Sequence, residues 1–132
     1  MSMHIGIIGL GAVGKKRFEL FRDIPEVSNI SFFDPTIKLF DSTRSVQTVE
    51  TLFSDKNIDA IVICTPNAPK KGLIKKAFES RKHIFCEKPP GISHADALNV
   101  ELLHRANPDI KIKFGFNHRY LSHYRSLKET VN

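Results

Sequence analysis

The chain has 132 residues, of which 41% are hydrophobic and 26% charged, and this composition suits a single soluble domain around one hydrophobic core. No apolar run approaches the roughly 20 residues of a membrane-spanning helix, and the first residues lack the apolar region and cleavage site of a signal peptide. We therefore expect a cytoplasmic protein with no membrane partner.

The net charge of +6 does not by itself indicate nucleic-acid binding, because lysine and arginine are spread along the whole chain. The densest cluster comprises Lys70, Lys71, Lys75 and Lys76, at a helical spacing that we interpret as a solvated face opposite an apolar stripe. Nucleic-acid surfaces usually carry denser charge with interleaved aromatic residues. The sequence therefore favours no nucleic-acid partner.

The cysteines and histidines give no sign of a disulfide framework or a metal centre. Cys64 and Cys86 each end a short apolar run, which favours reduced cysteines in the core. The histidines are scattered and show no spacing typical of metal ligands. We expect no metal site.

Strand-like and helix-like segments alternate along the chain. Continuous apolar runs predict strands at residues 4–8, 30–33, 60–64, 83–86 and 110–114. Amphipathic spacing predicts helices at residues 12–22, 49–53, 69–80, 93–105 and 121–131. We expect Val13, Phe18 and Phe21 to face the core on the first helix, and Ser93 to cap the fourth. The alternation predicts a single three-layer α/β domain, with a doubly wound, mostly parallel sheet between two layers of helices.

A glycine-rich loop, Gly9-Leu10-Gly11-Ala12-Val13-Gly14, joins the first predicted strand to the first helix. In this pattern the first glycine permits a sharp turn, the second lets a pyrophosphate approach the backbone, and the third lets the helix pack closely on the sheet. The helix N-terminus then presents unpaired N–H groups to the phosphates. The loop predicts a dinucleotide-binding Rossmann domain, with cofactor contacts from Gly9, Gly11, Ala12, Val13 and Gly14.

Asp34 ends the second predicted strand, at the distance from the loop expected of a ribose-binding carboxylate. Such a carboxylate accepts hydrogen bonds from the adenosine ribose and repels a 2′-phosphate, so NAD is favoured and NADP remains possible. The alternative is a turn or capping aspartate before Pro35. Residues 35–48 barely provide a parallel crossover, so we expect the helix after this strand to be reduced or lost and the adenosine side to be open.

Lys15, Lys16 and Arg17 lie in the first turn of the first helix, where positive charge opposes the helix dipole. One hypothesis is that an anionic ligand offsets their charge. The alternative is that they are solvated surface residues. Both interpretations remain open at this point.

Three polar loops follow later strands, where an open parallel sheet binds its ligands. Thr65-Pro66-Asn67 is either a cofactor loop or an ordinary turn. Glu87-Lys88-Pro89-Pro90 places a lysine that is suited to donate a proton or orient a substrate hydroxyl. The last loop, residues 115–120, concentrates hydrogen-bonding groups in Gly-Phe-Asn-His-Arg-Tyr.

In this order, the glycine loop, Asp34 and the three polar loops resemble the N-terminal domain of the Gfo/Idh/MocA oxidoreductases. The resemblance implies hydride transfer between NAD(P) and a hydroxyl or carbonyl carbon of a sugar, nucleotide sugar or cyclitol. It implies that Lys88 is the catalytic lysine and also contacts the cofactor. It further implies cofactor contacts from Thr65, Pro66, Asn67 and Glu87, and substrate-side positions for Asn117 and Arg119. Lys70 stands where the family often has a histidine, so that contact is not carried over.

The resemblance also divides the chain. Residues 1–120 correspond to the dinucleotide-binding domain, and residues 121–132 to a helix leading into a C-terminal substrate domain that this sequence lacks. We therefore expect a chain that binds NAD without turnover, and a full-length form that is a homo-oligomer. The alternative is a stand-alone NAD-binding or regulatory module that acts with a partner chain.

Overall fold

The computed structural model describes residues 2–37, 41 and 43–131. Its centre is a five-stranded sheet in the order β2-β1-β3-β4-β5, in which all neighbouring strands are parallel. The strands are β1 (Met3–Ile8), β2 (Val27–Phe33), β3 (Ala60–Ile63), β4 (His83–Cys86) and β5 (Ile112–Phe114). The strand order reverses between β1 and β3, and such a switch point is where open parallel sheets bind their ligands.

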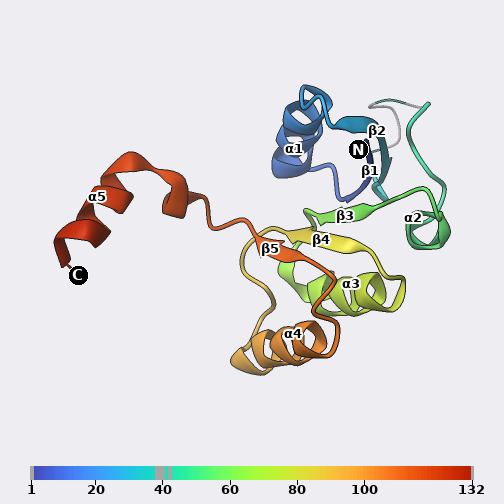
Figure 1. Ribbon diagram of the computed structural model, residues 1–132. Helices are drawn as coiled ribbons and strands as arrows, with labels where there is room; N and C mark the ends of the chain where they lie inside the picture. The colour runs from blue at the N-terminus through green and yellow to red at the C-terminus, as the bar shows by residue number, and fades with distance from the viewer. Residues whose placement is uncertain (1, 38–40, 42, 132) are drawn as a thin grey trace.

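Helices cover both faces of the sheet, as Figure 1 shows, with α1 on one side and α3 and α4 on the other. They are α1 (Ala12–Arg22), α2 (Val49–Ser54), α3 (Asn67–Glu79), α4 (His94–Ala106) and α5 (Ser122–Val131), with a 3-10 turn η1 (Asn117–Tyr120) before the last. Each face has its own apolar core: Phe18 of α1 is buried on one side, and Ile74 of α3 with Val100 of α4 on the other. The doubly wound, three-layer prediction is confirmed.

The predicted elements lie close to the observed ones. Ser93 caps α4 as predicted, because its hydroxyl accepts a hydrogen bond from Asp96 N at 3.2 Å. Strand β5 begins later than expected, at Ile112, while Ile110 is buried in the preceding turn. The apolar run therefore marked a buried segment longer than the strand itself.

The prediction that Val13 faces the core is wrong. Phe18 is buried and Phe21 packs against the same cluster, but Val13 is 47% exposed. Phe18 and Phe21 belong to the face of α1 that packs on the sheet, whereas Val13, in the first turn, does not. Val13 lines a cavity beside the glycine loop instead of the core.

The crossover between β2 and α2 is reduced as predicted, over the part of it that the structure describes (residues 35–37, 41 and 43–48). No helix forms there, and Ser45 pairs with Phe32 as an isolated parallel bridge beside β2. Hydrogen bonds from Phe32 N to Arg44 O and from Val46 N to Phe32 O, both 2.9 Å, hold this segment. The edge of β2 is thus covered by extended chain.

Across the part of the chain that the structure describes, none of the helices combines the length and the apolar composition needed to cross a bilayer.

Candidate functional site

The three glycines of the loop after β1 have different structural roles. Gly9 has φ +91°, which favours glycine, and a Cβ on Gly14 would lie 1.9 Å from the carbonyl oxygen of Gly9. Both residues are therefore required by the turn and by the close approach of α1. A Cβ on Gly11 would meet nothing within 4 Å, so the fold leaves open space above this residue.

A cavity of about 660 Å³ opens beside this loop, at the carboxyl ends of β1, β2 and β3. Its volume lies within the usual range of small-molecule sites. It includes these residues predicted to bind the cofactor: Gly9, Gly11, Ala12, Val13, Asp34, Thr65 and Pro66. The N-terminus of α1 lies at its wall, where free N–H groups attract an anion.

Asp34 is held by hydrogen bonds at the mouth of this cavity. Its Oδ1 accepts from Thr36 N, Thr36 Oγ1 and Ile37 N at 2.8–2.9 Å, and its Oδ2 accepts from Leu10 N at 2.7 Å. Burial acts to raise the pKa of Asp34, but these hydrogen bonds outweigh it and lower the pKa below its ordinary value. Asp34 is therefore a turn aspartate, as one of the two predictions held. Its charged Oδ2 faces the glycine loop and can still accept a further hydrogen bond.

A second cavity, of about 280 Å³, lies further along the same edge, beyond β4 and β5. It is lined by Lys88 and by residues 115–119, so it brings together Lys88, Asn117 and Arg119. These are the residues that the sequence predicts for catalysis and for the substrate side. Parallel strands end at one edge, which explains why loops far apart in sequence share this cavity.

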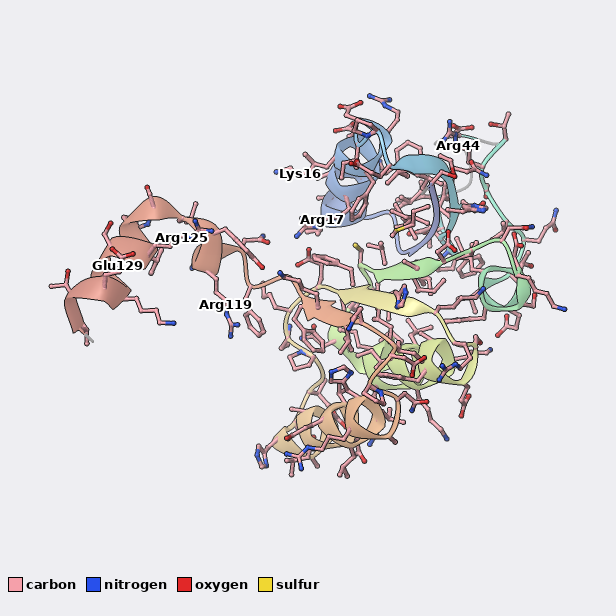
Figure 2. All side chains as sticks on the ribbon, viewed as in Figure 1. Lys16, Arg17, Arg44, Arg119, Arg125 and Glu129 are labelled. Atoms are coloured by element: carbon pink, nitrogen blue, oxygen red, sulfur yellow. The ribbon has the colours of Figure 1, made fainter. Side chains whose placement is uncertain are left out.

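Arg17 of α1 joins the two halves of this edge. Its Nε and Nη2 donate to Glu87 Oε1 at 2.8 and 2.5 Å, and Nη2 also donates to Asn117 Oδ1 at 3.2 Å. Its guanidinium lies 4.7 Å from the ring centroid of Phe85. The alternative that Arg17 is a solvated surface residue is wrong, because its side chain is 18% exposed and pairs with the Glu87 carboxylate. The hypothesis of an anionic ligand near the cations at the start of α1 stays a prediction. Figure 2 shows where Arg17 lies on α1. Lys16 is exposed.

Glu87 is buried beneath the backbone of Gly115. A Cβ on Gly115 would lie 2.6 Å from Glu87 Oε2, so this glycine makes room for the carboxylate. With Arg17 on Oε1, Glu87 connects β4, α1 and the loop after β5. Sequence reasoning missed this pairing because the two residues are far apart in the chain.

Lys70 contradicts the prediction of a solvated lysine face, since it is only 1% exposed. Its ammonium donates to Asn67 Oδ1 at 3.1 Å, to Lys88 O at 2.9 Å and to Pro89 O at 3.1 Å. Burial lowers its pKa, and so does the nearby charge of Lys88. The signal was present in the sequence: Lys70 precedes Ile74 and Ala77 at i, i+4 and i+7, the spacing of the buried face. The neighbouring lysine Lys71 does reach solvent and pairs with Asp96.

Neither cysteine is in a disulfide, and the prediction of a core position is confirmed for Cys86 but not for the half-buried Cys64. Burial raises the pKa of Cys64 to about 12 and that of Cys86 to about 11, so neither is a reactive thiolate. Cys86 is buried and Cys64 contributes to the wall of the larger cavity. Among the described residues, no group of histidine, cysteine or acidic side chains is arranged to hold a metal ion.

A glycine loop at the switch point, an acidic residue ending β2 and a cavity between them define the protein as a Rossmann-type domain for a dinucleotide. The model of the oxidoreductase family with the NAD-binding Rossmann fold, Gfo/Idh/MocA, matches residues 3–110. The chain belongs to this family, and NAD is the cofactor that the family's domain binds.

Several known proteins are similar to this chain. The uncharacterized oxidoreductase YrbE of Bacillus subtilis is 33% identical, over 96% of this chain and 39% of that protein. Myo-inositol 2-dehydrogenase of Thermotoga maritima is 28% identical, over 98% of this chain and 40% of that enzyme. The crystal structure of scyllo-inositol dehydrogenase from Lactobacillus casei, with NAD(H) and scyllo-inositol, matches 99% of this chain with a TM-score of 0.87 and 23% identity. The chain spans about 40% of the length of the curated relatives it matches.

Proposed function

We propose that the chain is the cofactor domain of an oxidoreductase that moves hydride between NAD and a hydroxyl or carbonyl carbon of a sugar, nucleotide sugar or cyclitol. The observation that carries the proposal is the pair of cavities along one sheet edge, one at the glycine loop and one at Lys88. The inositol dehydrogenases among the relatives favour a cyclitol. Residues 1–120 form the cofactor domain in this proposal, and residues 121–132 lead toward a substrate domain.

The residues of the larger cavity fit the cofactor. The open space above Gly11 and the N–H groups at the start of α1 receive the pyrophosphate. Asp34 accepts a ribose hydroxyl through Oδ2, and its charge disfavours the 2′-phosphate of NADP. The loop after β3, with Thr65, Pro66 and Asn67, contacts the cofactor in this proposal. The described start of the reduced crossover, residues 35–37, lines the adenosine side.

The residues of the smaller cavity act on the substrate. NAD, when bound, supplies the hydride acceptor or donor of such a reaction. Lys88 hydrogen-bonds the reacting oxygen and moves its proton at Nζ. Asn117 and Arg119 lie in the same cavity and orient the substrate. Glu87 carries its charge against Arg17, so it supports the nicotinamide side without acting as a base.

Calorimetric titration with NADH and NADPH tests cofactor binding. NADH should bind, and NADPH should bind more weakly because Asp34 repels its 2′-phosphate. Lys75→Met, a neutralised exposed lysine on α3, serves as the control and should leave both affinities unchanged. Absence of binding to either dinucleotide contradicts the proposal.

Turnover is a separate test. With NAD and myo- or scyllo-inositol, this chain alone should give no measurable NADH, because hydride transfer requires a substrate held against the cofactor. If a separate partner chain restores turnover, the alternative of a module acting with a partner is favoured. Steady turnover by this chain alone would contradict the proposal that a substrate domain is required.

A further inference from the structure

We propose that Lys70 is a positioning residue of this site: its buried ammonium holds the Lys88–Pro89 backbone and orients the Asn67 amide. The inference rests on the proposed function, because Lys88 and Asn67 are the residues that it places at the nicotinamide end of the cofactor. It assigns a task to a side chain that touches neither of the two cavities.

The hydrogen bonding of the Lys70 ammonium is complete. An ammonium group has three hydrogens, and Lys70 Nζ finds one oxygen for each, at 2.9–3.1 Å. Burying an unpaired ammonium costs much free energy. Lys70 is only 1% exposed, so the hydrogen bonds to these three oxygens must offset the cost of burying its charge. An apolar residue would fill the same space on α3 at less cost but would leave these oxygens without a donor.

Two of these oxygens belong to the backbone. They are the carbonyl oxygens of the consecutive residues Lys88 and Pro89, and both accept a hydrogen bond from Lys70 Nζ on α3. The segment that follows β4 contains Pro89 and Pro90, which have no N–H groups with which to anchor it. Lys70 therefore anchors the loop from which the Lys88 side chain reaches the smaller cavity.

The third oxygen belongs to Asn67, at the first turn of α3. Lys70 takes its amide oxygen, and no described residue accepts a hydrogen bond from its NH2 group. The orientation of the Asn67 amide is thereby set, with the oxygen turned to Lys70 and the NH2 group free to donate. One buried cation thus holds an amide side chain after β3 and the backbone after β4, two adjacent strands.

The experiment compares Lys70→Met with wild type and with Lys75→Met, the matched control at an exposed position of the same helix. Hydrogen–deuterium exchange should rise about tenfold in the segment 86–92 of Lys70→Met and stay unchanged in α1, because a lost charge-assisted hydrogen bond is worth about one order of magnitude. A uniform rise in both segments, or no rise at 86–92, overturns the proposal. If Lys70→Met does not fold, Lys70→Gln, which keeps an amide donor of shorter reach, replaces it.

Two ligands then distinguish positioning from general stabilisation. NADH reaches both ends of the site, whereas ADP-ribose lacks the nicotinamide. Lys70→Met should bind NADH about tenfold more weakly than wild type and ADP-ribose within about twofold of it. Equal weakening of both ligands, or no change in either, overturns the proposal, as does a wild type that binds the two ligands equally well.

A wild type that binds neither ligand contradicts the proposed function instead. The anchoring of the loop is then still decided by the exchange measurement and by amine labelling of the wild-type chain. Acetylation of Lys70 should be at least about tenfold slower than that of Lys75, because Lys70 is buried with every hydrogen engaged. Equal labelling rates overturn the proposal.

Discussion

At the scale of single residues, the three glycines of the loop and Asp34 are each constrained by a different physical cause. Gly9 and Gly14 are required by the backbone: Gly9 has a positive φ, and a side chain on Gly14 would overlap the carbonyl of Gly9. Gly11 leaves space that the protein itself does not fill. Asp34, which we propose binds ribose, also connects the end of β2 to Leu10 through its carboxylate.

The glycines give a matched pair of variants. Gly14→Ala should destabilise the free protein by about 3 kcal/mol, because its Cβ would meet backbone that cannot move aside. Gly11→Ala should cost less than about 1 kcal/mol but weaken NADH binding by at least about tenfold, since the methyl group enters the space for the pyrophosphate. Urea unfolding and calorimetry measure the two effects. Equal stabilities for the two variants would contradict the division of roles.

Asp34 predicts a pH dependence of stability. Its pKa in the folded chain is lower than the ordinary value of 3.8, so its stabilising contribution is present above that value and is lost as the pH falls through the folded pKa. Asp34→Asn should therefore lower the free energy of unfolding by roughly 1–2 kcal/mol at about pH 7. The difference from wild type should shrink below about pH 4, as measured by urea unfolding at several pH values.

The control is Asp23→Asn, at an exposed position, which should change stability by less than about 0.5 kcal/mol. A wild-type advantage over Asp34→Asn that is the same in acid and at neutral pH would be inconsistent with a charged, hydrogen-bonded Asp34.

At the scale of elements, the carboxyl edge of the sheet is assembled by cations that cross between elements. Arg17 reaches from α1 to the ends of β4 and η1, and Lys70 reaches from α3 to the loop after β4. On the opposite edge, Lys82 is also buried and donates to the carbonyls of Asp55 and Ile58, each at 2.6 Å. Buried or partly buried cations thus join loops to neighbouring elements where backbone pairing has ended.

Arg17→Met should destabilise the protein by about 2–4 kcal/mol, because it leaves the Glu87 carboxylate largely buried without its partner. The double variant Arg17→Met/Glu87→Gln should recover most of this loss, since it removes the uncompensated charge as well. Chemical unfolding of the two single variants and the double variant gives the coupling free energy between Arg17 and Glu87. Additive effects of the two substitutions would show that the pair contributes nothing beyond its separate residues.

At the scale of the whole molecule, the packed body ends before α5. Every residue of α5 is exposed, including its apolar side chains Tyr124, Leu127 and Val131. Figure 1 shows this helix extending away from the sheet and from the other helices. The hydrophobic core therefore does not depend on α5, and its apolar side chains are available to a further polypeptide.

A chain that ends after Tyr120 should keep the melting temperature of the full sequence within about 2 °C, because α5 buries no residue against the body. Its affinity for NADH should also be unchanged, since the cavity at the glycine loop contains no residue beyond Leu73. Differential scanning calorimetry and titration measure both. A large loss of either property would contradict a cofactor domain that ends at residue 120.

The sequence alone determined the class of fold, and it predicted most residues of the candidate site, because both depend on local patterns. Apolar runs alternating with amphipathic helices predict a parallel sheet, and residues that follow parallel strands are brought to one edge by topology. This is why the sequence predicts that the glycine loop, Asp34, the Thr65 loop and Lys88 lie along one edge of the sheet, where the structure has two cavities. The family relationship confirmed the Rossmann fold and its cofactor.

Only the tertiary structure decided how these residues are held. Arg17 pairs with Glu87, and Lys70 with the backbone of Lys88, across separations at which a one-dimensional pattern carries no information about contact. Val13 was placed wrongly because its apolar side chain suggested the core, whereas in the structure it lines the cavity beside the glycine loop. Burial of a charge depends on how the layers assemble, and in the structure Lys70 is buried and Arg17 is partly buried at the candidate site.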